Sequence, residues 1–139
     1  MSTYFKKVMI IDDNKIDRWL LKKNISRTDL AEEIIEVETG IEALNLLTAT
    51  AEEHLKFPDI IFLDMQMPVL SGLEFLDAFN ELIDGNEINC RIVIACSVED
   101  PVEKKKVFKY NFVIGYYQKP LSEPALLELK ELVRQPSAS

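Results

Sequence analysis

The chain has 139 residues, of which 47% are hydrophobic and 29% are charged. These proportions are ordinary for a soluble globular protein, and the length suits one domain with a buried core. We therefore expect a single domain over residues 1–134, followed by a short, polar, disordered tail over residues 135–139.

The net charge of −8 argues against direct binding of nucleic acid, because an acidic surface repels phosphate backbones. No apolar run is long enough to span a bilayer, so no membrane partner is expected. The first residues lack the apolar stretch of a signal peptide, which makes the cytoplasm the expected location.

Short apolar runs rich in β-branched residues alternate with longer amphipathic stretches. In chain order, the predicted strands are 8–11, 34–37, 60–63, 92–95 and 112–114, and the predicted helices are 16–25, 41–51, 73–83, 100–110 and 122–133. Strands this apolar are typical of a sheet covered on both faces. The alternation predicts the α/β class, with a doubly wound parallel sheet of five strands and five helices.

The cysteines and the histidine are expected to be structural. Cys90 and Cys96 lie in or beside one apolar run. In an extended segment they would be roughly 20 Å apart, too far for a disulfide, so they are expected to be buried. His54 stands among charged residues and is expected on the surface.

Polar side chains follow the predicted strands at the points where ligands bind in such sheets. Asp12 and Asp13 follow the first strand, Asp64 the third, Ser97 the fourth and Lys119 the fifth. A single aspartate there often only caps the next helix. Three carboxylates at one edge need a cation instead, and Mg²⁺ prefers a few carboxylates and water. With an ammonium and a hydroxyl nearby, the set suits a phosphoryl group.

The motifs around these residues resemble those of response-regulator receiver domains, the phospho-acceptor halves of two-component signalling. The resemblance covers about residues 7–133. It rests, in order, on Ile11-Asp12-Asp13, on Leu63-Asp64-Met65-Gln66-Met67-Pro68 with Gly72 beyond it, on Ala95-Cys96-Ser97, and on Lys119-Pro120-Leu121. It implies a flavodoxin-like fold with strand order 2-1-3-4-5.

The resemblance also implies a role for each acidic residue. Asp64 would accept the phosphoryl group and would contact Mg²⁺. Asp13 would bind the ion directly, Asp12 mostly through water, and the backbone carbonyl of Gln66 would be a further ligand.

Further roles follow from the same resemblance. Ser97 would contact the phosphoryl group, and Lys119 would pair first with Asp64 and later with a phosphoryl oxygen. The bond from Lys119 to Pro120 would be cis. Tyr116 stands at the position of the aromatic switch residue and is expected to rotate inward after phosphorylation, whereas Tyr117 should face the other side of the sheet.

Three positions are expected to tune the rate of dephosphorylation. Val98 stands where many family members have a small residue, so it should crowd the phosphoryl group and hinder water. Gln66 could orient water, and Glu99 could repel phosphodonors. Both also suit a purely polar surface role.

The leading hypothesis is a stand-alone receiver that signals through protein contacts and is not a turnover enzyme. Its expected partners are a sensor histidine kinase or a histidine phosphotransfer protein, and a downstream protein that binds the face formed by residues 100–110, 112–114 and 122–133.

The alternative functions are a phosphohydrolase, a flavin-binding module and a receiver that no longer takes phosphate. Gln66 argues against the first, because that class has a second aspartate there. Asp12 and Asp13 argue against the second, since they repel phosphate, and the intact acidic set argues against the third.

Overall fold

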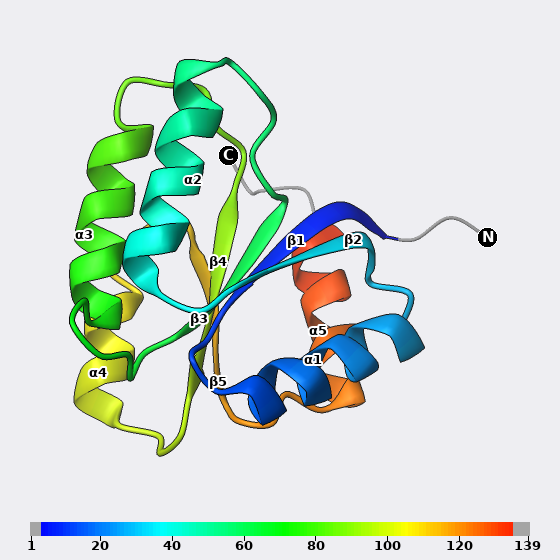
Figure 1. The fold of residues 1–139 in the computed structure, drawn as a ribbon. Helices are drawn as coiled ribbons and strands as arrows, with labels where there is room; N and C mark the ends of the chain where they lie inside the picture. The colour runs from blue at the N-terminus through cyan, green and yellow to red at the C-terminus, as the bar shows by residue number, and fades with distance from the viewer. Residues whose placement is uncertain (1–3, 135–139) are drawn as a thin grey trace.

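Five parallel strands form one sheet in the order β2-β1-β3-β4-β5, with helices on both faces (Figure 1). This computed structural model describes residues 4–134, so the expected tail at 135–139 lies outside the described residues. The α/β class and the flavodoxin-like strand order are both confirmed. The elements are β1 (Phe5–Ile11), α1 (Lys15–Arg27), β2 (Ala31–Val37), α2 (Gly40–Glu52), β3 (Ile60–Asp64), α3 (Gly72–Ile83), β4 (Arg91–Cys96), α4 (Pro101–Val107), β5 (Val113–Gln118) and α5 (Glu123–Arg134).

Three predicted strands were too short: β1 begins at Phe5 and not at Val8, β2 begins before Ile34, and β5 ends beyond Ile114. β2 begins at Ala31 and includes Glu32 and Glu33, which are exposed. An edge strand keeps polar residues, so apolar content alone misses it. β5 runs on to Gln118, past Gly115, whose absent side chain leaves room for the ring of Tyr117.

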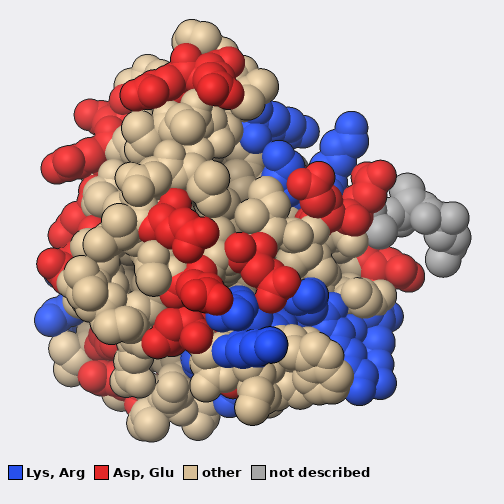
Figure 2. Space-filling model, in the orientation of Figure 1, with Lys and Arg blue, Asp and Glu red and all other residues tan. Residues whose placement is uncertain are grey.

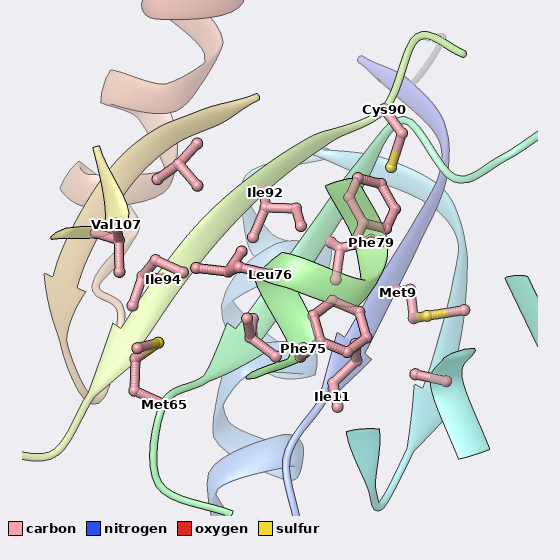
Figure 3. Packing of buried hydrophobic residues seen from close by; sticks show 14 of the residues in the cluster. Met9, Ile11, Met65, Phe75, Leu76, Phe79, Cys90, Ile92, Ile94 and Val107 are labelled. Carbon is pink, nitrogen blue, oxygen red and sulfur yellow. The ribbon is translucent and has the colours of Figure 1, made fainter. Parts of the chain in front are cut away.

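The core consists of two apolar layers, one on each face of the sheet. Helices α2, α3 and α4 cover one face, and α1 and α5 cover the other. On the first face, Phe75 and Phe79 of α3 stack with ring centroids 6.0 Å apart and lie against Ile11 of β1 and Ile92 of β4 (Figure 3). Truncation of such a fully buried aromatic ring to alanine typically costs about 3–5 kcal/mol. The two layers therefore fix the sheet on which the strand ends are carried.

Local signals in the sequence fix the helix starts at the carboxyl edge of the sheet. Asn14 caps α1, and Asp100 caps α4 with Pro101 at its first position. Gly72 opens α3 directly against Met65, where an added Cβ would lie 2.9 Å from the Cα of Met65. The chain can therefore leave β3 and turn into α3 only with glycine at this position.

The remaining structural predictions concern the cysteines and the histidine. Cys90 and Cys96 are free and buried, and His54 is exposed, as expected. Within residues 4–134, no helix is long and apolar enough to span a membrane.

The surface charge is uneven. Acidic side chains spread over much of the visible face, whereas lysine and arginine side chains gather over α1 at the lower right (Figure 2). That helix carries Lys15, Lys22, Lys23 and Arg27. The surface next to the carboxyl edge of the sheet is therefore positive over α1, although the whole chain is acidic.

Candidate functional site

Three carboxylates meet where β1 and β3 end. Asp12 and Asp13 directly follow β1, and Asp64 is the last residue of β3, the strand paired with β1. Asp12 and Asp64 are buried, while Asp13 is exposed. One oxygen from each of the three residues lies within 4.8 Å of the others. The predicted convergence of these carboxylates is what the fold produces.

Lys119 supplies a positive charge to the same cluster. Its Nζ lies 3.1 Å from Oδ2 of Asp12 and 3.4 Å from Oδ1 of Asp64. Its backbone N–H donates to the carbonyl of Cys96 at 2.8 Å, which ties the end of β5 to the end of β4. The bond from Lys119 to Pro120 is cis, as predicted.

Burial dominates the electrostatics of Asp64. The net pKa of this carboxyl is raised to about 6, chiefly by loss of solvent and in smaller part by the neighbouring charge of Asp12. The N–H of Gln66, which donates to Oδ1 of Asp64 at 3.1 Å, and the ammonium of Lys119 act in the opposite direction. The hydrogen bond from Gln66 and the charge of Lys119 thus offset only part of the free-energy cost of burying the negative charge of Asp64. A bound cation would lower that cost further.

The ammonium of Lys119 is held firmly in its charged form. Burial by itself lowers its pKa, but hydrogen bonds to Asp17 and Asp12 and the charges of Asp12 and Asp64 raise the pKa above the usual lysine value. Lys119 is therefore a fixed positive charge over the whole physiological pH range.

The loop that carries Asp12 is fixed from two sides. The N–H of Asn14 donates to Oδ1 of Asp12 at 2.9 Å. Nη1 of the buried Arg18 donates to the backbone carbonyl of Asp12 at 2.7 Å, and its Nε donates to Glu36 at 3.2 Å. The first turn of α1 and β2 thus jointly orient the acidic loop.

The other predicted residues lie around the rim of the cluster. Ser97 and Glu99 are exposed in the loop after β4, and Val98 there has 70% of its surface exposed. Gln66 is exposed in the loop after β3. Val69 in that same loop has a φ of 72°, a left-handed conformation that a β-branched side chain rarely adopts. Both loops follow strands that end at this edge of the sheet, and the roles of these side chains remain predictions.

Tyr116 lies on the face of the sheet covered by α4 and is already buried. Its hydroxyl accepts the N–H of Asp100 at 3.0 Å and donates to Glu103 at 2.9 Å, so it contacts the first turn of α4. The ring is thus already buried in this structure, and its rotation after phosphorylation stays a prediction. Tyr117 packs on the opposite face, as expected.

Sequence reasoning missed two residues that belong to this region, Asp17 and Arg18. Oδ2 of Asp17 lies 2.9 Å from Nζ of Lys119, closer than either Asp12 or Asp64. An acidic residue such as Asp17 in the first turn of a helix suits the helix dipole, and this does not indicate a contact with Lys119. Arg18 gave no signal either, since a charged residue on an amphipathic helix normally faces solvent.

The donor set fits a hard divalent cation. Oxygen ligands from a few carboxylates are what Mg²⁺ prefers, and the exposed Asp13 leaves the cluster open to water for the remaining positions. The residues that would hold it are Asp12, Asp13 and Asp64. The carbonyl of Gln66, implied by the family resemblance, would join them.

The fold and the site together define a receiver domain. The sequence matches the response regulator receiver domain family over residues 8–131, so the chain belongs to that family. Proteins of this family are signalling proteins and not enzymes in the usual sense.

Named relatives agree with this assignment. The polar-differentiation response regulator DivK of Brucella ovis is 32% identical over 123 residues, which cover 88% of this chain and 91% of that protein. A two-component response regulator from Cytophaga hutchinsonii superposes with a TM-score of 0.85 at 29% identity, covering 94% of this chain and 98% of the other.

A third protein is similar in fold. The receiver domain of the histidine kinase CKI1 from Arabidopsis thaliana, complexed with Mg²⁺ and BeF₃⁻, has a TM-score of 0.75. It is 22% identical and the match covers 91% of this chain and 89% of that one.

Proposed function

We propose that this receiver domain accepts a phosphoryl group on Asp64 and passes the signal on by a change of shape. The observation that carries the proposal is the cluster of Asp12, Asp13 and Asp64 with the ammonium of Lys119 at the edge of the sheet. The cluster can bind groups of both charges, because the carboxylates suit a cation and the ammonium suits an anionic phosphoryl group.

The proposed step is the transfer of a phosphoryl group from a phosphohistidine. An oxygen of Asp64 forms a bond to phosphorus while the phosphorus–nitrogen bond breaks, and the electron pair leaves with the imidazole. The product is an acyl phosphate on Asp64. Lys119 neutralises one phosphoryl oxygen, and the Ser97 hydroxyl donates to another.

Mg²⁺ is the cofactor we propose for this step. When bound, it would neutralise charge on the carboxylates and on the phosphoryl oxygens. The geometry of Asp12, Asp13 and Asp64 supports it. So does the Mg²⁺ complex of the CKI1 receiver, whose fold is similar.

The phosphodonor would be a histidine kinase or a histidine phosphotransfer protein. The lysines and arginine over α1 would attract an acidic surface of an approaching partner to the region beside the site (Figure 2).

We propose that the loop after β4 moves when the Ser97 hydroxyl is drawn to the phosphoryl group, and that Tyr116 transmits the movement. Its contacts with Asp100 and Glu103 support this, because they link β5 directly to the start of α4. A downstream protein would then read the face of α4, β5 and α5.

Labelling with a small phosphodonor tests the proposal. Incubation with acetyl phosphate and Mg²⁺ should add one phosphoryl group, measured as a mass shift, and the bond should be labile at alkaline pH. Asp64→Asn should take up none, while the matched variant Asp59→Asn at the other end of β3 should be labelled normally. Equal labelling of Asp64→Asn would show that another residue is the acceptor.

A further inference from the structure

Asp17 makes the shortest contact to the ammonium at the site. Its Oδ2 lies 2.9 Å from Nζ of Lys119, compared with 3.1 Å for Asp12 and 3.4 Å for Asp64. The residue sits in the first turn of α1, where its own N–H donates to the side chain of Asn14 at 3.0 Å. The cap on the helix therefore fixes the backbone from which this carboxylate reaches Lys119.

The donors of Lys119 are unequally shared. A lysine ammonium has three N–H donors. Hydrogen bonds to Asp12 and Asp17 use two of them, and Asp64 is reached only by a longer ion pair. A phosphoryl group on Asp64 would have to draw this ammonium towards itself, against the carboxylate of Asp17.

The ammonium has room to respond. A cavity of about 20 Å³ borders it, lined in part by Asp17, Leu21, Asp64 and Lys119. Its size is enough for about one water molecule, so the head group can shift without moving the backbone. The ammonium thus has three carboxylates as its charged neighbours and a small space beside its side chain.

We propose that Asp17 is a positioning residue that competes with the phosphoryl group for Lys119. It holds the ammonium on the α1 side of the site and thereby weakens the ion pair between Lys119 and the phosphoryl group on Asp64. This inference rests on the proposed phosphoryl acceptance by Asp64. It assigns Asp17 the role of shortening the lifetime of the phosphorylated state.

The first test measures the loss of the phosphoryl group after labelling with acetyl phosphate and Mg²⁺. Asp17→Asn should lose it several-fold more slowly than the wild type, because Lys119 is released to the phosphoryl oxygens. Asp17→Glu, which keeps the charge, should decay at a rate closer to the wild type. Glu38→Gln is the matched control: it removes one negative charge near the same edge of the sheet but contacts Arg18 and not Lys119. Its decay should be unchanged.

The second test needs neither metal nor phosphate. In metal-free buffer, the midpoints of thermal unfolding are compared for the wild type, Asp17→Asn, Lys119→Met and the double variant. If Asp17 binds the ammonium directly, the two changes should be non-additive by a few degrees. The same cycle with Glu38→Gln in place of Asp17→Asn should be additive.

The outcomes separate this inference from the function on which it rests. Wild-type or faster decay in Asp17→Asn, with labelling still blocked by Asp64→Asn, would overturn the role of Asp17 and keep Asp64 as the acceptor. Additive unfolding shifts would likewise overturn it. Failure of the wild type to take up any phosphoryl group would overturn the proposed function itself.

Discussion

Two aspartates bracket β3, and they have opposite surroundings. Asp59 stands directly before the strand, and its Oδ2 accepts the backbone N–H groups of Lys6 and Lys7 at 3.0 and 3.3 Å. Asp64 ends the strand beside Asp12, Asp13 and Lys119, with one backbone N–H from Gln66. The same residue type at the two ends of one strand is thus an acceptor for backbone N–H groups at one end and a member of a charged cluster at the other. The difference teaches that neighbours, and not residue identity, assign the role.

The largest expected effect concerns the metal at the Asp64 end. Titration with Mg²⁺ should shift amide NMR signals near Asp13 and Asp64, and Asp13→Ala should abolish that response, because it removes the open carboxylate of the cluster. Asp59→Ala should leave it intact. If Asp13→Ala responds to Mg²⁺ as the wild type does, the assignment of a metal site to this cluster is wrong. The two ends of β3 would then not differ in metal binding.

Stability should respond in opposite directions at the two ends. Asp59→Ala leaves two backbone N–H groups without their acceptor and should lower the free energy of unfolding by about 1–2 kcal/mol. Asp64→Ala removes a buried carboxylate with a raised pKa and should raise the free energy of unfolding at pH 7 by about 1–3 kcal/mol. Urea denaturation in metal-free buffer measures both. Changes of the same sign would contradict the comparison.

The pH dependence sharpens the same contrast. Burial raises the pKa of Asp64 to about 6 in the folded state, above its value in the unfolded chain, so folding favours the protonated form. The contribution of Asp64 to stability is therefore fully present below the unfolded pKa and is lost as the pH rises through about 6.

The carboxyl carbon of Asp64 should titrate by NMR with a midpoint near 6 in metal-free protein, and Mg²⁺ should move that midpoint lower. In parallel, the stability gained by Asp64→Asn should grow as the pH rises towards 6 and then stay level. A midpoint near that of a free aspartate would show that Asp64 is as well compensated as an exposed carboxylate.

The smallest expected effect comes from the rim. Val98 has 70% of its surface exposed beside the site, and we expect Val98→Ala to shorten the lifetime of phosphorylated Asp64 a few-fold by admitting water. Val102→Ala, an equally conservative change at a valine with 62% of its surface exposed on α4, is the control and should not alter the decay. If Val98→Ala and the wild type lose the phosphoryl group at the same rate, Val98 does not hinder the attack of water on phosphorylated Asp64.

Much of this site was predictable because the strand ends are marked in the sequence. Asp12, Asp13, Asp64 and Lys119 each follow an apolar run, and parallel strands bring their carboxyl ends to one edge. Asp17 was not predictable in this way, since its contact with Lys119 joins the first helix to the end of the last strand. Nothing in the local pattern of α1 indicates which distant cation its first turn will meet.

The sequence by itself determined the alternation of strands and helices, the caps of α1 and α4, and the residues at the strand ends, because these depend on local periodicity and backbone preference. Only the tertiary structure decided how the ammonium of Lys119 is shared among three carboxylates and that Tyr116 is buried against the start of α4. It also decided that Asp59 and Asp64 differ. Burial and the charges of groups distant in sequence set these properties, and both exist only once the chain has folded.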